Sequence, residues 1–290
     1  MKLSTAIIYA LTAITLTGCS VGRALVIKSA RPFLDDSMTA LLRESDPEIA
    51  RAAMATELKL LEGLLLSTPN DYKLLTMAAQ GFTGYAMLYY DPMEQEKAQS
   101  LYYRGLMYGN RALSLRNAVF GQTESRFEEF ESAMESLRNE DIGAVYWTAV
   151  AWGGWINTSR TNPMAIAEFP RVRLLMDWVI DRDETYFYSG ANWFYGVYYS
   201  TLPPIVGGDV EKSRTYFEKA IVQTKGEFLW GKLYYAQTYA LQTINRPLFE
   251  RLLKDIIEAK SDGLSEATLL NQIAKQRAKE LLTQTDELFF

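Results

Sequence analysis

The chain contains no histidine and a single cysteine, Cys19, among its 290 residues. The lack of histidine excludes Ser-His-Asp and Cys-His catalysis and nearly every zinc site. The sequence also has no Walker phosphate loop and no dinucleotide-binding glycine motif. The composition does not exclude catalysis by carboxylates alone or by a Ser-Lys pair, although no motif indicates either. We therefore expect a protein that is not an enzyme and that carries no cofactor and no metal.

Charge of one sign is not concentrated anywhere in the sequence. The net charge is −5, and acidic and basic residues are interspersed. This pattern argues against a nucleic-acid partner and against a polybasic membrane contact. After the N-terminal segment, no apolar run reaches the roughly 20 residues that a transmembrane helix needs. We therefore expect membrane attachment through a lipid anchor only.

The N-terminal segment has the pattern of a lipoprotein signal peptide. Lys2 precedes an apolar run that ends at Leu16, and small residues lead to Cys19. This order predicts a signal peptide over 1–18 and acylation of Cys19. More than one acyl chain gives stable membrane attachment. The alternative is an ordinary signal peptide with a cysteine at this position by chance.

Two further expectations follow from this segment. Residues 19–36 are predicted to form the acylated N-terminus and a tether. Ser20 follows the cysteine in place of the Asp that commonly signals inner-membrane retention. We therefore expect the protein at the periplasmic face of the outer membrane, anchored through Cys19.

The rest of the chain, residues 37–290, is predicted to be one all-α domain. Apolar residues recur at helical spacing, and strand patterns are scarce. Asp46 and Asp71 stand where N-caps are expected, and Pro47 suits a first helical turn. Short polar connections between helices favour antiparallel neighbours. The helical patterns cover 47–67, 71–90, 93–117, 124–138, 141–158, 163–181, 185–200, 209–224, 227–243, 247–260 and 264–284.

Small and large residues alternate in the manner of tetratricopeptide repeats, which are helix pairs of about 34 residues. Small residues on one helix face let the paired helix approach closely. The spacing of these motifs is irregular, so we predict a superhelical array of degenerate repeats. A generic helical bundle is the alternative. The motifs are Leu75-x-x-Ala78-Ala79-x-x-Phe82, Ala98-x-x-x-Tyr102-x-x-Gly105 and Ser213-x-x-x-Phe217-x-x-Ala220.

Several stretches of the chain resemble the T-component family of TRAP transporter systems (TatT). The resemblance covers almost the whole chain after the signal peptide, and the stretch from Leu60 to Asp71 is its most specific part. The other matching stretches are Ala78-Ala79-Gln80-Gly81-Phe82, Leu101-Tyr102-Tyr103-Arg104-Gly105, Tyr146-Trp147, Trp152-Gly153-Gly154-Trp155, Gly207-Gly208-Asp209-Val210-Glu211-Lys212 and the helix from Asn271 to Leu282.

The resemblance implies a fold and a role. Members of this family are periplasmic lipoproteins built of cryptic tetratricopeptide repeats, which associate as trimers and partner with the solute-binding P-component. The resemblance therefore implies that this protein assists solute uptake by handling a ligand and that it catalyses no reaction. Any role that the family gives to a histidine cannot apply to this chain.

The richest group of candidate site residues is aromatic. First helices of stacked repeats share a concave inner wall, where such proteins bind ligands. Gly153, Gly154 and Gly196 lie among the aromatic residues and are predicted to leave room for an apolar or amphipathic ligand. The alternative is that these residues are core. The candidates are Trp152, Trp155, Asn192, Trp193, Tyr195, Tyr198, Tyr199 and Tyr235.

Three functions remain open at this point. The first is a lipid-anchored periplasmic accessory component of a TRAP-type uptake system, which binds the P-component and a ligand. The second is a tetratricopeptide scaffold for envelope assembly without a small ligand. The third, a carboxylate-based hydrolase, needs an acid pair across a cleft.

Overall fold

The computed structural model describes residues 31–122 and 124–289, and this part of the chain contains helices and no β-strand. The predicted all-α fold is confirmed. A helix over 31–42 is followed by α2 (Pro47–Ser67), α3 (Tyr72–Tyr89), α4 (Gln95–Ser114), α5 (Phe127–Ala133), α6 (Ile142–Thr158), α7 (Pro163–Ala167), α8 (Phe169–Arg182), α9 (Tyr186–Thr201), α10 (Val210–Gln223), α11 (Leu229–Tyr235), α12 (Arg246–Glu258), α13 (Thr268–Thr283) and α14 (Thr285–Leu288).

Helix starts follow the capping signals in the sequence. The carboxylate of Asp46 accepts hydrogen bonds from the first backbone N–H groups of α2, and Asp71 does the same for α3. These side chains satisfy donors that have no partner within the helix. Asp209 caps α10 in the same way, accepting from the backbone N–H of Lys212 at 3.0 Å.

Four predicted helical segments are interrupted. Residues 124–138 form only the short α5 and the 3₁₀ turn η2 (Met134–Ser136), and 163–181 is split into α7 and α8 at Glu168. Pro170 explains that break, because proline suits a first turn and disfavours a helix that runs into it. α11 passes into the π-helix η5 (Ala236–Ala240), and α13 is preceded by the 3₁₀ turn η6 (Ser265–Ala267).

Neighbouring helices pack as pairs: α3 with α4, α6 with α8, α9 with α10, and α11 with α12. The repeat-like residues lie in these contacts, since Ala78, Ala98 and Phe217 are fully buried. Gly105 of α4 shows why a small residue is needed. A β-carbon there would lie 2.5 Å from Oγ1 of Thr83 on α3. The motifs therefore mark close helix contacts, which is consistent with a superhelical array of repeats.

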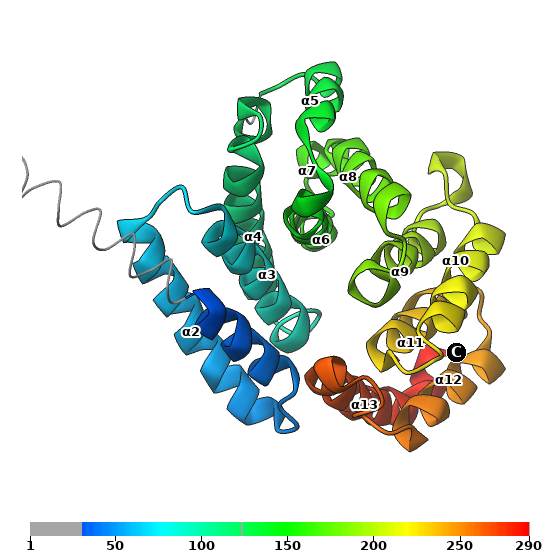
Figure 1. Cartoon of the computed structure of the whole chain (residues 1–290). Helices are drawn as coiled ribbons and strands as arrows, with labels where there is room; N and C mark the ends of the chain where they lie inside the picture. The colour runs from blue at the N-terminus through cyan, green and yellow to red at the C-terminus, as the bar shows by residue number, and fades with distance from the viewer. Residues whose placement is uncertain (1–30, 123, 290) are drawn as a thin grey trace, which may run out of the picture.

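The helix pairs are arranged along a curve (Figure 1). α6, α9 and α11 lie nearer the centre of the array than α8, α10 and α12. The curve turns back on itself, so that α13 lies beside α2 near the start of the chain. No helix in the described part of the chain is both long and apolar enough to cross a bilayer.

Arg277 joins the two ends of the curve. Its guanidinium Nη2 donates hydrogen bonds to the carbonyl oxygens of Met87 (3.2 Å) and Leu88 (2.9 Å) in the last turn of α3. It also stacks on the ring of Trp230, 4.9 Å from the centroid. Burial lowers the pKa of Arg277, although nearby anionic groups oppose that effect. The charge is therefore held inside the protein by two carbonyls and one aromatic face.

The folded body begins earlier than residue 37. Residues 31–36, which the sequence analysis assigned to the tether, are helical, and Leu34 is buried. Arg31 forms an ion pair with Asp71 at 2.6 Å, and Lys73 pairs with Asp35. Cys19 and the predicted signal peptide lie outside the described residues.

We predict that Arg277→Ala lowers the free energy of unfolding by about 2 kcal/mol, because the carbonyls of Met87 and Leu88 lose a charged donor. Arg277→Lys should recover only part of this, since an ammonium lacks the planar fork. Urea unfolding provides the measurement, and the exposed Arg251→Ala on α12 is the control. An equal effect of Arg277→Ala and Arg251→Ala would contradict the role of Arg277.

Candidate functional site

The predicted cavity residues are mostly buried. Trp152 on α6 is 7% exposed, and Trp193 and Tyr195 on α9 are 4% and 2% exposed. Trp155 and Tyr199 keep partial exposure. Asn192, Tyr198 and Tyr235 complete the set, and all three are buried.

Two of the three glycines, Gly154 and Gly196, do not leave the room that was predicted beside them. A β-carbon at Gly154 would lie 2.5 Å from the ring of Tyr102, and one at Gly196 would lie 2.8 Å from the ring of Phe217. At Gly153 the nearest ring atom, from Phe194, is 3.7 Å away. Aromatic rings from the neighbouring helices therefore occupy the space beside Gly154 and Gly196. The prediction that Gly154 and Gly196 leave room for a ligand is therefore wrong.

The seven aromatic candidates belong to several separate aromatic contacts. Trp152 packs edge-on against Phe130, and Trp155 lies against Tyr103. Trp193 and Tyr235 both contact Phe217. A separate group forms on the other side of α9, where Tyr195 and Tyr199 each contact Tyr216, and Tyr195 also contacts Tyr198.

Trp193 and Trp155 differ in how they are held. The indole N–H of Trp193 donates to the carbonyl of Tyr188 at 2.7 Å, and its ring lies where a β-carbon at Gly231 would come within 2.3 Å. Trp193 thus fills an interface between α9 and α11. Trp155 is half-buried, and its ring lies 5.8 Å from that of the exposed Tyr103. Among the predicted residues, Trp155 and Tyr199 are the two that keep partial exposure, and Trp155 is the better placed to meet a ligand or a partner because it also adjoins the exposed ring of Tyr103.

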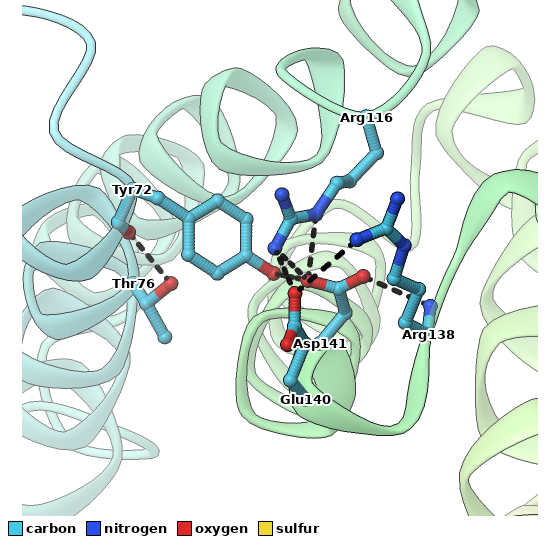
Figure 2. Close-up of polar contacts among 6 residues, drawn as sticks. All are labelled: Tyr72, Thr76, Arg116, Arg138, Glu140 and Asp141. Atoms are coloured by element: carbon cyan, nitrogen blue, oxygen red, sulfur yellow. Dashed lines mark hydrogen bonds and ion pairs between the residues drawn. The ribbon is translucent and has the colours of Figure 1, made fainter.

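A polar network joins three segments at the start of α6 (Figure 2). The carboxylate of Asp141, which is fully buried, accepts from the hydroxyl of Tyr72 at 2.5 Å and from Nε of Arg116 at 2.8 Å. Its other oxygen accepts from the backbone N–H of Arg138 at 2.9 Å. Arg116 also stacks on the Tyr72 ring, 4.4 Å from the centroid, and pairs with Glu140.

The protonation state of Asp141 follows from these contacts. Burial disfavours its charged form, but the hydrogen bonds from Arg116, Tyr72 and the Arg138 N–H outweigh burial, so the pKa of Asp141 is lowered. Burial, followed by the hydrogen bond to Asp141, raises the pKa of Tyr72. Asp141 is therefore ionised and Tyr72 neutral at physiological pH. With its oxygens accepting from the phenol, the guanidinium and a backbone N–H, the carboxylate serves as a structural junction.

The backbone at the start of α9 is unusual. Phe187, Tyr188 and Ser189 have φ values of 45°, 57° and 67°, so three successive residues with side chains are left-handed. This conformation costs roughly 1–2 kcal/mol for each such residue, and glycine is the residue that normally adopts it. The surrounding contacts must compensate for that cost. Tyr188 stacks on Phe228 with centroids 4.9 Å apart, and Phe187 packs edge-on against Trp147 at 4.7 Å.

A cleft of about 440 Å³ lies beside this left-handed turn. Residues 185–189 form one wall, Gln223 and Thr224 at the end of α10 form another, and Leu264 and Glu266 before α13 complete it. This cleft was not predicted from the sequence. No sequence signal marks it, because the left-handed residues are not glycines and the three walls come from distant parts of the chain.

Acidic residues do not assemble into an evident metal site. Within residues 31–122 and 124–289, no group of three or more carboxylates or other metal-binding side chains is placed to hold an ion.

These features define a class of protein: an all-helical curved array of helix pairs, closed by its last long helix and stabilised by buried polar junctions. Comparison with family models identifies the class more closely. Residues 43–289 match the model of the TRAP transporter T-component. The chain belongs to this family, which confirms the resemblance seen in the sequence. A comparison with the curated proteins gave no match.

Membership of this family gives the chain a role as an accessory component of a transport system, which is not a class of enzyme.

We predict that Asp141→Asn lowers the free energy of unfolding by about 3 kcal/mol at pH 7, because it leaves the Arg116 charge without its buried partner. The pKa of Asp141 is lowered in the folded state, so its ionic contribution is present above the unfolded pKa of about 4 and is lost as the pH falls through the folded value. Denaturant unfolding at pH 7 and pH 3 should show a smaller difference between mutant and wild type at pH 3.

The matched control for this prediction is Glu140→Gln. Glu140 pairs with the same arginine at 3.0 Å, but its side chain is 62% exposed. We expect little change in stability, since exposed ion pairs contribute between 0 and about 1 kcal/mol. A cost for Asp141→Asn no larger than that for Glu140→Gln would show that the buried junction is unimportant.

Proposed function

We propose that this protein is a lipid-anchored periplasmic component of a TRAP-type uptake system that binds the solute-binding P-component. The observation that carries the proposal is the match to the T-component family over residues 43–289. The curved array of helix pairs supports it, because stacked helical repeats offer extended concave surfaces for partners. A trimer, as the sequence resemblance implies, is part of the proposal.

The proposal includes an apolar or amphipathic ligand handled by aromatic residues of the inner helices. Trp155 is the residue proposed to contact this ligand, because it is half-buried on α6, whereas Trp193 is enclosed between α9 and α11. An aromatic side chain with one accessible face suits contact with apolar groups.

The alternative is a scaffold for envelope assembly with no small ligand. It rests on the same helix pairs, since tetratricopeptide-like surfaces also capture peptides. Capture of unrelated envelope proteins by the chain, together with no binding of the P-component, would favour this alternative.

We predict that Trp193→Ala and Trp155→Ala have different effects, because Trp193 is a core residue and Trp155 is a candidate site residue. Trp193→Ala should cost about 3–5 kcal/mol of stability, because it empties a packed interface. Trp155→Ala should cost much less, since the ring is half-exposed, and should instead reduce solute uptake or binding of the P-component. Urea unfolding, co-purification with the P-component of the same system and an uptake assay give the three readings.

The wild-type chain and Val222→Ala, a change at an exposed residue of α10, serve as controls for this comparison. If the wild-type chain does not bind the P-component, the transport role fails as proposed. If Trp155→Ala is as destabilising as Trp193→Ala and leaves uptake per folded molecule unchanged, Trp155 is core.

The anchor has its own test. We expect wild-type cells to incorporate labelled palmitate into the chain at Cys19, and Cys19→Ala to remain unprocessed and unlabelled. The labelled protein should fractionate with the outer membrane. Cys19→Ser, which keeps the size of the side chain, is the control for a non-specific effect of the substitution. Wild-type protein without palmitate would contradict lipid anchoring.

A further inference from the structure

The cleft beside the left-handed turn has a preorganised polar wall. Asn192 is fully buried, and its Nδ2 donates to Oγ of Ser189 at 2.9 Å and to Oε1 of Gln223 at 3.0 Å. The hydroxyl of Ser189 also donates to Oε1 of Gln223. Two donors therefore hold the amide oxygen of Gln223, which fixes the orientation of this half-buried side chain.

This arrangement leaves hydrogen-bonding capacity at the cleft. The Nε2 group of Gln223 donates to no residue in the described part of the chain, and Gln223 lines the cleft. Behind it, Oδ1 of Asn192 is buried without a hydrogen-bond partner. Buried polar atoms without partners are uncommon in folded proteins, and each calls for a physical explanation. An amide that is held through its oxygen is a ready donor to a ligand hydroxyl.

The charge of the cleft restricts what it can bind. No basic side chain lines it, and its one charged residue, Glu266, forms an ion pair with Arg43 at 3.1 Å. An anionic ligand would meet the carboxylate of Glu266, whose ion-pair partner Arg43 does not line the cleft. Apart from the aliphatic Leu264, the uncharged lining consists of hydroxyl, amide and aromatic groups, which favours a neutral ligand with several hydroxyls.

The aromatic side of the cleft supplies the apolar contact. Tyr186, Phe187 and Tyr188 are half-buried and follow one another through the left-handed turn. Strained backbone of this kind persists where surrounding structure holds it, and it gathers at binding sites. Aromatic faces suit the C–H groups of a sugar ring, and a cleft of this volume falls within the usual range for small-molecule sites.

We propose that the cleft formed by residues 185–189, Gln223 and Glu266 binds a neutral, polyhydroxylated ligand of monosaccharide size. The aromatic side chains contact the ring of the ligand, and Gln223 donates from Nε2 to one of its hydroxyls. Asn192 and Ser189 are positioning residues that hold Gln223. This site is distinct from Trp155 and goes beyond the proposed partnership with the P-component.

The test uses the full chain and a matched pair of probes, glucose and glucuronate, which differ by one carboxylate. Galactose, mannose and N-acetylglucosamine extend the neutral set. Saturation-transfer NMR and calorimetry should show at least one neutral sugar binding in the millimolar range or tighter. Glucuronate should bind at least about tenfold more weakly than glucose, because it adds a negative charge beside Glu266.

Variants assign the binding to the cleft. Gln223→Ala should weaken sugar binding by about tenfold or more through the lost hydrogen bond. Tyr188→Gly removes an aromatic face and relieves backbone strain, because glycine readily adopts the left-handed conformation of this position, so it tests the cleft if Gln223→Ala proves unstable. Gln242→Ala, at an exposed glutamine after η5, is the matched control and should bind as the wild type does.

Three results would overturn the proposal: no saturable binding of any neutral sugar up to roughly 100 mM, glucuronate binding as tightly as glucose, or unchanged binding in both Gln223→Ala and Tyr188→Gly. Co-purification with the P-component is measured on the same proteins. Its loss in Gln223→Ala would be a fourth result against the proposal, because it would show that this face contacts the partner. If the wild-type protein binds a sugar but not the P-component, the proposal of a sugar-binding cleft is retained and the proposed transport role is contradicted.

Discussion

The contact between Arg277 and the end of α3 sets the shape of this protein. Stacked helix pairs contact mainly their neighbours, so an open array would leave its first and last helices uncovered. Here a cation from α13 binds two carbonyls of α3, about 190 positions earlier in the chain. Burying an arginine is unfavourable unless hydrogen bonds and aromatic contacts compensate, and Trp230 provides such a contact. The first and last parts of the fold are therefore coupled.

A second constraint is the filling of glycine positions by aromatic rings. Tyr102 lies against Gly154, Phe217 against Gly196 and Trp193 against Gly231. Each ring belongs to a different helix from its glycine, so the large aromatic content is used mainly to join successive helices. Trp155 and the aromatic residues of the left-handed turn are among the aromatic side chains that stay partly exposed.

The sequence predicted what depends on nearby residues. The starts of α2 and α3 follow from Asp46 and Asp71, whose caps act within three residues. The repeat-like motifs correctly marked positions of close helix contact, such as Gly105. The sequence does not show which ring from another helix occupies the space beside a glycine, so the prediction of free space at Gly154 was wrong. It also gives no sign that Phe187–Ser189 turn left-handed, because their intrinsic preference is for the opposite hand.

If Cys19 is acylated as proposed, the helix over 31–42 limits the distance between the folded body and the membrane. Leu34 is buried, and Arg31 is tied to Asp71, so the body begins by residue 31. Residues 20–30 separate it from the proposed acylated cysteine. Whatever conformation they adopt, they span at most about 40 Å. A P-component bound to this body would therefore be confined to a thin layer next to the bilayer, where its effective concentration is raised.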